Sequence, residues 1–413
     1  LTFLLLLGTL ISVAVSSKDQ LKIEGVASFS EYYIVLLCSL IGAVIFVSSS
    51  DFITLFLGLE IMSIPLYGLC GSSLFRSKSS EAGIKYLFLG SLGTAFFLFG
   101  TALLYGDFHS LNFNLIASKA EQFSPSLLAP ALVLLLIGFL FKIAVVPFHF
   151  WTPDVYQGSP TSLVVYMATV VKVAAVGALV RVVSLFLSFA GLWHTVLLVL
   201  WYGAFLTIIF ANLVALRQAD IKRMLAYSSI AHAGYLALGV LALPEGAVAG
   251  VALLYYLLVY TLMTAGAFVV LMAVSREGDS DGDYLITNFN GLSYHSPLLA
   301  ACMSIFLFGL AGLPPGMAGM VGKVYLFSVA IKSGLIGLSI VAIIGSLISC
   351  YYYLRIVVAM YFLPSSQYAE GMPLAGKAFS KRAVAVFCAV LVVVLGVYPS
   401  KIFSFLGFLK EIL

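Results

Sequence analysis

The stretch FKIAVVPFHFWTPDVYQGSPT, from Phe141 to Thr161, places Lys142, Pro147 and His149 inside an apolar run. Proline removes a backbone hydrogen bond and breaks a helix interior. Broken helices are tolerated at membrane depth only where they line protein or water. The stretch therefore predicts a discontinuous membrane helix with a charged side chain beside its break.

The composition around this stretch is that of an integral membrane protein. Of 413 residues, 62% are hydrophobic and only 9% are charged, a balance that a water-soluble domain of this size does not show. The apolar runs are continuous and do not alternate, which favours helices over a barrel.

Apolar runs between turn and charge signals predict twelve spans. One of them, 297–331, is too long for a single crossing and is interrupted at AGLPPGMAG, as 127–158 is at Pro147. The expected fold class is all-α, a polytopic membrane protein. The spans are 1–16, 31–48, 51–71, 82–105, 127–158, 160–189, 192–215, 222–242, 246–274, 297–331, 332–362 and 383–407.

The two interrupted spans hold matching places, because each stands fourth in a set of five. An odd-numbered repeat must re-enter the bilayer from the opposite face, so the pattern predicts two inverted five-helix repeats, each with a discontinuous helix. The expected organisation is 1–30 as an N-terminal helix and loop left from a longer N-terminal part, 31–189 and 190–362 as the repeats, and 363–413 as a C-terminal loop and helix.

The basic residues between spans are unevenly divided between the two sides. Eleven against four satisfies the positive-inside rule and predicts both chain ends on the non-cytoplasmic side. The cytoplasmic group is Lys18, Lys22, Arg76, Lys78, Arg217, Lys222, Arg223, Arg276, Lys377, Lys381 and Arg382, and the opposite group is Lys119, Lys332, Lys401 and Lys410.

Six of the 21 basic residues remain within the spans once the fifteen loop cations are set aside, and Glu60 is the one acid deep in a span. A charge at a helix centre costs about 2.5 to 3.5 kcal/mol on insertion scales, so each needs a partner, a wet cavity or an escape to the surface. They are Lys85, Lys142, Lys172, Arg181, Lys323, Arg355 and the single deep acid Glu60.

Lys142 has no acid in its own helix, so its partner must come from another span, and Glu60 is the candidate. A neighbouring carboxylate favours the charged form of a desolvated lysine. Moving that carboxylate would therefore change whether the lysine is protonated. The alternative is a purely structural buried ion pair.

Other ionisable residues are weighed in the same way. Lys172 and Lys323 are flanked by small residues that leave room for water, which favours proton transfer over snorkelling. His149 suits a relay or a structural hydrogen bond equally well. Lys85 has Glu81 one turn earlier, and His232 is assigned to packing or hydrogen bonding.

No cofactor site is expected in this chain. The five cysteines lie in apolar segments without CxxC spacing, and GMAGMVGKV has the wrong spacing for a phosphate loop. No glycine fingerprint follows a strand and no histidine pair is placed for haem, so neither a metal nor a redox centre is expected.

Five runs together resemble one known family. They are FLGLEIMSIPLYGL, EAGIKYLFLGSLGTAFFLFG, FKIAVVPFHFWTPDVYQGSPT, ALRQADIKRMLAYSSIAHAGYL and AGLPPGMAGMVGKVYLF. They are similar to the antiporter-like subunits of proton-pumping NADH:quinone oxidoreductase, respiratory complex I, and WTPDVYQGSPT is typical of the subunit N type. The family has fourteen helices with inverted five-helix repeats, so the resemblance implies that its first two are absent here.

Carried over by position, the resemblance implies proton translocation by Glu60, Lys142, His149, Lys172, Lys323 and Lys85. It implies that this chain is a non-redox subunit of a translocase in a bacterial cytoplasmic (inner) membrane. Its partners would be lipid and other membrane-arm subunits, with no nucleic acid. NADH, FMN, iron–sulfur clusters and quinone would be bound by partner subunits in the electron-transport part of the complex.

Two alternatives remain open. The same lysines would serve a component of a multi-subunit sodium/proton antiporter, although a sodium site would be expected to use more carboxylates than Glu60 alone. A passive scaffold whose buried charges only orient helices is the third reading.

Overall fold

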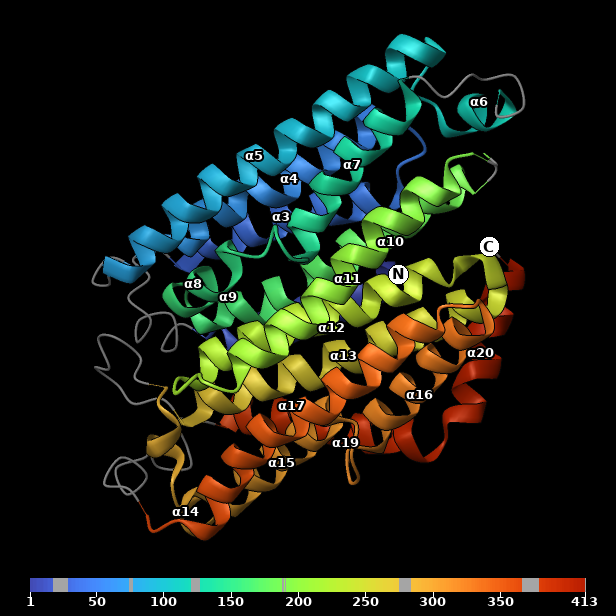
Figure 1. Cartoon of the computed structure of the whole chain (residues 1–413). Helices are drawn as coiled ribbons and strands as arrows, with labels where there is room; N and C mark the ends of the chain where they lie inside the picture. The colour runs from blue at the N-terminus through green and yellow to red at the C-terminus, as the bar shows by residue number, and fades with distance from the viewer. Residues whose placement is uncertain are drawn as a thin grey trace.

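The computed structural model describes residues 1–17, 29–73, 77–119, 127–187, 189, 191–274, 284–365 and 379–412. Within these ranges the chain is a bundle of helices with two isolated β-bridges and no strand (Figure 1). The helices of the first half are α1 (Thr2–Val15), α3 (Phe29–Ser48), α4 (Phe52–Cys70), α5 (Ser77–Phe108), α6 (Phe113–Ser118), α7 (Leu128–Ile143), α8 (Trp151–Gly158), α9 (Thr161–Tyr166), the π-helix η2 (Met167–Val171) and α10 (Lys172–Phe186).

The second half is also helical in its described part. Its elements are α11 (Trp193–Ala215), α12 (Ile221–Leu241), η3 (Leu243–Glu245), α13 (Ala247–Val274), η4 (Ile286–Phe289), α14 (Leu292–His295), α15 (Pro297–Ala311), α16 (Met317–Lys332), α17 (Ile336–Phe362), α19 (Phe379–Val397) and α20 (Pro399–Ile412). In Figure 1, α6 and α20 lie at one end of the bundle and α8 and α14 lie at the other.

The prediction of a polytopic all-α membrane protein is confirmed. Nine helices among the described residues are long and apolar enough to cross a membrane, and three shorter apolar helices, α1, α7 and α15, accompany them. Each of the twelve predicted spans falls on helix. The last span is wrong in one respect, because the helix ends at Val397 and a new one starts at Pro399.

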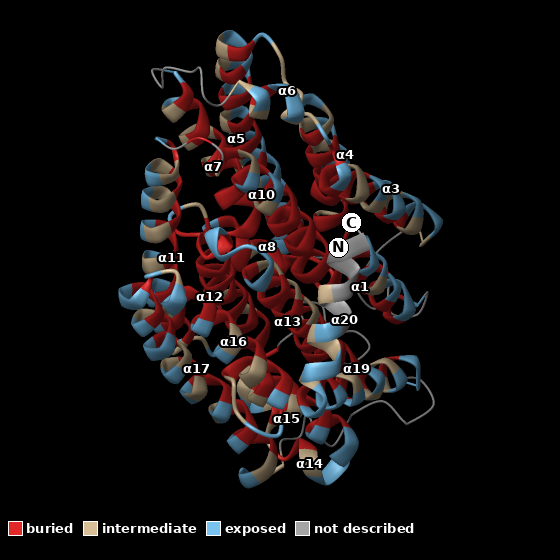
Figure 2. Cartoon of the chain, turned by 90° about the vertical axis from the view of Figure 1, so that its right-hand side faces the viewer, coloured by how far each residue is buried: buried red, intermediate tan, exposed pale blue. Residues whose placement is uncertain are grey.

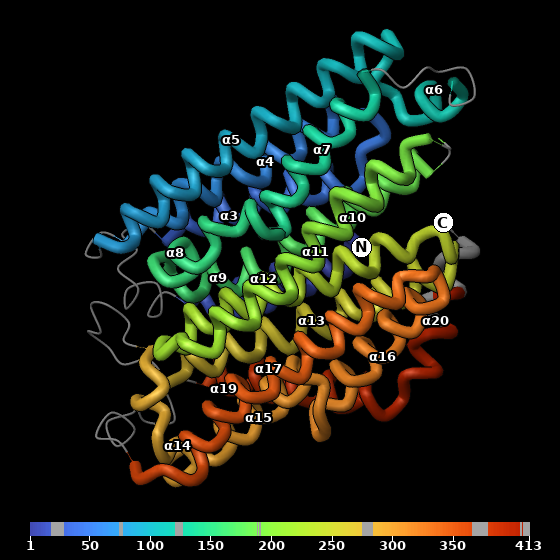
Figure 3. Tube along the Cα trace, in the orientation of Figure 1, coloured from blue at the N-terminus to red at the C-terminus, as the bar shows by residue number. Residues whose placement is uncertain are grey.

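Both predicted breaks are present, and the chain path through them is clear in Figure 3. The half-helix before the first break, α7, is capped by Ala144, with φ 62°. The half-helix before the second break, α15, is capped by Gly312, with φ 87°. Left-handed residues of this kind close a helix by turning the next N–H groups back onto its last free carbonyls. Val145 N–H reaches Leu140 in this way.

The second break follows the same pattern, since Leu313 N–H reaches the Phe308 carbonyl. Each break continues through a cis peptide bond before a proline, Val146–Pro147 and Pro314–Pro315. The two sites therefore share backbone construction although their sequences differ.

The helices of the two predicted repeats pack in the same order. In the first set α3 packs on α4, α4 on α5, α5 on both halves of the broken helix, and α10 on α3. The second set repeats this with α11, α12, α13, the broken α15 and α16, and α17. This matching order is what two five-helix repeats require.

The innermost helices are the most deeply buried. In the most apolar 18-residue stretch of each, 94% of residues are buried in Thr161–Phe186, 100% in α12 and 94% in α13, and Figure 2 shows these helices in the centre. Outer helices such as α17, with 33% buried, present apolar side chains to their surroundings. Polar residues on the inner helices are therefore sealed from lipid.

Two residues assigned to cytoplasmic loops lie inside the bundle. Lys222 in the first turn of α12 is fully buried and donates to the Ser159 carbonyl at 2.6 Å. Lys381 in α19 is buried and donates to the Met272 carbonyl at 3.2 Å. Their assignment as exposed loop charges was wrong, because they lie at helix starts that other helices cover. Lys18, Lys22, Arg76, Arg276 and Lys377 lie outside the described residues.

Candidate functional site

Lys142 lies in the last turn of α7, immediately before the first break, and is 4% exposed. Its Nζ has no hydrogen-bond partner among the described residues. Three aromatic rings surround it, with Nζ 5.5 Å from the Tyr67 ring centre, 5.4 Å from Tyr86 and 5.8 Å from Phe141. Ring faces attract a cation without accepting a conventional hydrogen bond.

Glu60 of α4 is the carboxylate whose charge acts on Lys142. The two do not form an ion pair within 4.0 Å in the described structure, and Glu60 Oε1 is buried without a partner. The expected pairing of Glu60 with Lys142 is thus present as electrostatic coupling but not as contact.

Two of the rings that face this lysine carry buried hydroxyls, those of Tyr67 and Tyr86, which lack partners among the described residues. The buried hydroxyls of Thr152 and Ser159, in the segment that follows the break, also lack partners among these residues. Buried polar groups of this kind are normally satisfied by ordered water. The surroundings of Lys142 therefore suit a hydrated pocket.

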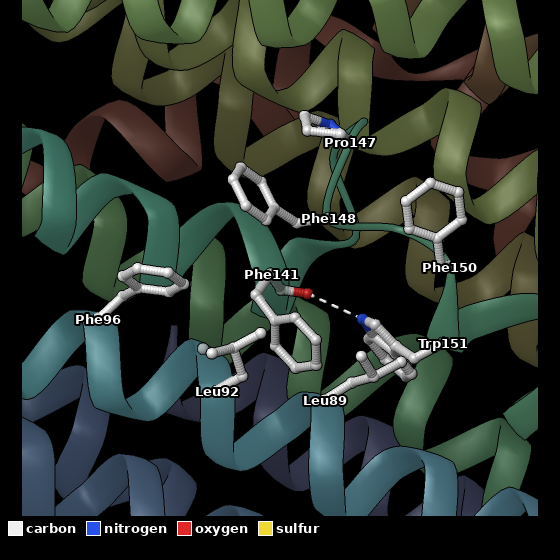
Figure 4. Close-up of a pocket in the computed structure, with 9 residues that line it drawn as sticks. Leu89, Leu92, Phe96, Phe141, Pro147, Phe148, Phe150 and Trp151 are labelled. Atoms are coloured by element: carbon white, nitrogen blue, oxygen red, sulfur yellow. Dashed lines mark hydrogen bonds between the residues drawn. The ribbon is translucent and has the colours of Figure 1, made fainter.

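A cavity of about 220 Å³ lies between α5 and the first break, and its lining is apolar (Figure 4). At the break, the Phe141 carbonyl accepts from the Ala144 N–H and from the Trp151 indole N–H, both at 3.1 Å. The lining residues are Leu89, Leu92, Gly93, Phe96, Phe141, Pro147, Phe148, Phe150 and Trp151.

His149 lies within the break itself and is 3% exposed. Its ring contacts those of Phe150 and Phe210, with centres 4.5 and 4.8 Å apart, and Nδ1 has no partner among the described residues. The imidazole ring thus lies at the break, and its Nδ1 makes no hydrogen bond to another described residue.

Lys172 follows the π-helical turn η2 and is 3% exposed. Its Nζ donates to the Ser229 carbonyl at 2.6 Å and to the Ser229 hydroxyl at 2.5 Å. That hydroxyl also bonds the Tyr260 hydroxyl at 2.8 Å. A π-turn shifts side chains around the helix axis, and such turns are frequent at functional sites.

Lys323 of α16 crosses to the end of α15. Its Nζ donates to the carbonyls of Leu310 and Ala311, at 2.7 and 3.0 Å, and to the Ser346 hydroxyl at 2.8 Å. Three acceptors match the three N–H bonds of an ammonium group. The lysine also borders a cavity of about 290 Å³ between α16 and α17.

His232 was assigned to packing or hydrogen bonding, and the structure confirms a hydrogen bond. It is buried in α12, and its Nδ1 lies 2.7 Å from the Tyr256 hydroxyl. Its ring centre lies 5.2 Å from that of Tyr260, which faces Lys172, and 5.5 Å from that of Tyr235, which faces Lys323. The partners on α13 could not be named from the sequence, since the packing of α12 against α13 decides them.

Lys85 is placed differently from the other predicted residues. Its Nζ lies 2.6 Å from both Glu81 and Asp154, and its side chain is 39% exposed. The pairing with Glu81 is confirmed, but Asp154 was not foreseen as a partner. Lys85 is thus at a polar end of the bundle and not in its sealed interior.

Asp220, which begins α12, lies outside the spans at this same end. Its Oδ1 accepts from the Arg223 N–H at 2.8 Å. Burial raises the pKa of its carboxyl, although the Arg223 N–H and the Lys222 charge act to lower it.

Three or more metal-ligating side chains do not come together anywhere in the described residues.

Comparison with known proteins agrees with this geometry. A sequence model described as NADH:quinone oxidoreductase/Mrp antiporter, transmembrane, matches residues 49–349. The chain is 42% identical over 360 residues to NADH-quinone oxidoreductase subunit N of Trichlorobacter lovleyi, covering 86% of this chain and 72% of that protein.

Solved structures give the same result. A chain of respiratory complex I from Thermus thermophilus has a TM-score of 0.82 and 36% identity, covering 98% of this chain and 84% of that one. A chain of an archaeal membrane-bound sulfane sulfur reductase has a TM-score of 0.85 and 29% identity, covering 98% and 80%. The chain therefore belongs to the NADH:quinone oxidoreductase/Mrp antiporter transmembrane family, in which its similar relatives are N subunits of NADH-quinone oxidoreductases.

Proposed function

We propose that the chain is the proton-translocating, antiporter-like subunit of a respiratory NADH:quinone oxidoreductase. The observation that carries the proposal is a set of three sealed lysines, Lys142, Lys172 and Lys323, each at a break or a π-turn. Buried ionisable groups in membrane helices mark proton routes far more often than they serve packing.

Lys142 is the proposed proton-exchanging group of the first repeat. Its Nζ has no acceptor among the described residues, so in this proposal its protonation depends on Glu60 and on water beside the break. Movement of Glu60 toward Lys142 favours the ammonium form, and withdrawal favours release. His149, which lies in the break, relays or gates the proton.

Transfer continues through the interior of both repeats. Lys172, the Ser229 and Tyr260 hydroxyls, and His232 lie between the two breaks, and Lys323 stands at the second. Hydroxyls and imidazole both donate and accept, so with intervening water they can pass a proton. Release past Lys323 toward the positive side would complete the path.

The chain needs an external energy source for this. Moving one charge against 100 mV costs about 2.3 kcal/mol, and the proposal places electron transfer from NADH to quinone in partner subunits that hold FMN and iron–sulfur clusters. This chain carries no redox group in the proposal. Its setting is a multi-subunit complex of a bacterial inner membrane, with both termini on the non-cytoplasmic side.

The competing function is sodium/proton exchange, for which Glu60 would be the carboxylate ligand. Glu60→Gln separates the two functions in vesicles that carry the complete complex. NADH-driven proton uptake, NADH oxidation and sodium-driven proton exchange are measured at equal complex content. Glu31→Gln, which changes the only acid in the first turn of α3, is the matched control.

A redox-coupled pump predicts that uptake and oxidation fall together in Glu60→Gln and that neither depends on sodium. Unchanged NADH-driven uptake with loss of sodium-driven exchange would overturn the proposal in favour of the antiporter. Unchanged values for both processes would leave Glu60 without a role and also contradict it.

A further inference from the structure

Asp154 of α8 joins three helices through its two carboxylate oxygens. Oδ2 accepts from Lys85 of α5 at 2.6 Å, and Oδ1 accepts from Arg223 of α12 at 2.8 Å. Arg223 also donates to the Gln157 amide oxygen at 2.9 Å. We call Lys85, Asp154 and Arg223 the three-residue clamp.

The clamp spans the boundary between the repeats. α5 and α8 belong to the first five-helix set, whereas α12 belongs to the second, and α8 packs on both α5 and α12. The carboxylate is therefore shared between a cation of one repeat and a cation of the other. A carboxylate can accept hydrogen bonds from two donors at once, so a displacement of α5 or of α12 would also displace α8.

The clamp is also directly connected to the Lys142 pocket. Trp151, one turn before Asp154, stacks on Tyr86 with ring centres 4.6 Å apart and donates to the Phe141 carbonyl. Tyr86 follows Lys85 in sequence and its ring faces Lys142. A shift of α8 therefore moves the aromatic wall over Lys142.

α8 and α5 are in close contact at Gly158. A Cβ on Gly158 would lie 2.2 Å from the Lys78 carbonyl oxygen and 2.8 Å from Ala82 Cβ. Beside this contact is a polar cavity of about 200 Å³, lined by Lys78, Glu81, Ala82, Asp154, Gln157, Gly158 and Arg223. Solvent in the cavity can reach the clamp, so its bonds can open and reform.

We propose that the three-residue clamp positions the half-helix beyond the first break and couples the two repeats, with Asp154 as its centre. Lys85 acts there as an ion-pair donor and not as a proton carrier. This inference deepens the proposed function and rests on it. Loss of the clamp frees α8, so that Lys142 exchanges protons out of step with electron transfer.

The first test separates the clamp from proton transfer at Lys85. An arginine at this position still donates to Asp154 but does not give up its proton, whereas methionine does neither. In vesicles with matched complex content, Lys85→Arg is expected to keep the wild-type ratio of protons taken up to NADH oxidised. Lys85→Met is expected to lower that ratio about threefold, the range of a partly exposed ion pair.

The second test is at Asp154. Asp154→Asn should lower the proton-to-NADH ratio at least as far as Lys85→Met, because it weakens the bonds to both Lys85 and Arg223, and the double variant should fall no further than Asp154→Asn. Asp154→Glu should restore most of the ratio. Glu81→Gln is the matched control, since it removes only the outer, 57% exposed partner of Lys85.

A lowered proton-to-NADH ratio in Lys85→Arg would overturn the clamp and indicate that Lys85 itself transfers protons. An unchanged ratio in Asp154→Asn would also overturn it. Lys142→Met, measured in the same vesicles, distinguishes failure of the clamp from failure of the proposed function. If Lys142→Met abolishes uptake while Asp154→Asn is normal, the proposed function stands and the clamp fails.

Discussion

The two helix breaks share backbone construction but hold their lysines in opposite ways. Lys142 precedes its break, and its Nζ meets aromatic rings and no acceptor among the described residues. Lys323 follows its break and binds two carbonyls and a hydroxyl. The difference arises because Lys323 belongs to the second half-helix and reaches back over the carbonyl end of the first.

This contrast assigns different tasks to the two repeats. The free carbonyls at a helix C-terminus carry partial negative charge, and two of them bind the Lys323 side chain in a fixed position. Lys142 has no such acceptor among the described residues. Under the proposed function, the first break is therefore the site that Glu60 controls, and the second is the site where backbone acceptors hold the lysine.

The strongest expected effect is at the packing of the second break. A Cβ at Gly319 would lie 1.9 Å from the Gly309 carbonyl oxygen, a contact with backbone that cannot move aside. Gly319→Ala should destabilise the subunit by at least about 3 kcal/mol and remove it from the assembled complex. Native gels of membranes measure this, with Gly337→Ala, which meets nothing within 4 Å, as the control. Normal assembly of Gly319→Ala would contradict the tight second break.

Lys323→Met should cost both stability and pumping. It leaves the Leu310 carbonyl without its side-chain donor, at about 1 to 3 kcal/mol, whereas the Ala311 carbonyl keeps the Ser346 hydroxyl. We expect a lower thermal midpoint of the purified complex and lost proton uptake, whereas Lys332→Met on the exposed end of α16 should change neither. A wild-type midpoint would mean that Lys323 is not an anchor.

Ser229→Ala tests the connection between the breaks. Lys172 would keep the Ser229 carbonyl but lose the hydroxyl that links it to Tyr260. Proton uptake per NADH should fall at least about tenfold, because a hydrogen bond to a charged group contributes about 1.5 to 3 kcal/mol. Ser304→Ala, whose hydroxyl bonds only its own helix in the described structure, is the comparison and should be near wild type. Equal values for the two variants would remove Ser229 from the path.

The smallest effect is expected at Ala144, the left-handed residue that closes the first break. Glycine occupies the equivalent position, Gly312, at the second break. Since a non-glycine residue pays about 1 kcal/mol in this conformation, Ala144→Gly should leave uptake unchanged and keep or slightly raise the thermal midpoint. A lowered midpoint would show that the methyl group contributes packing that outweighs the backbone cost.

Much of this architecture follows from local sequence. Proline positions in VVPFHFWTPD and AGLPPGMAG predicted both breaks, and apolar run lengths predicted helix at all twelve spans. These features depend on backbone hydrogen bonding and on bilayer thickness, which act within one segment. The described structure therefore matches the sequence prediction most closely at the level of single helices.

The contacts between helices could not be read in this way. Lys222 and Lys381 look like loop charges until neighbouring helices cover them. The partners of Lys323, and the sharing of Asp154 between Lys85 and Arg223, depend on tertiary packing across many residues of sequence. His232 was assigned to packing or hydrogen bonding, but its partner Tyr256 could not be named from the sequence because it lies on another helix.

Proton uptake per assembled complex in Lys142→Met tests the central claim most directly. Because Lys142 Nζ satisfies no acceptor among the described residues, its removal should leave complex content and thermal midpoint as in wild type. The account predicts that NADH-driven uptake nevertheless falls at least about tenfold, the loss expected when the proton-exchanging group is removed. Uptake at the wild-type level in the assembled variant would contradict it and leave Lys142 as a structural cation.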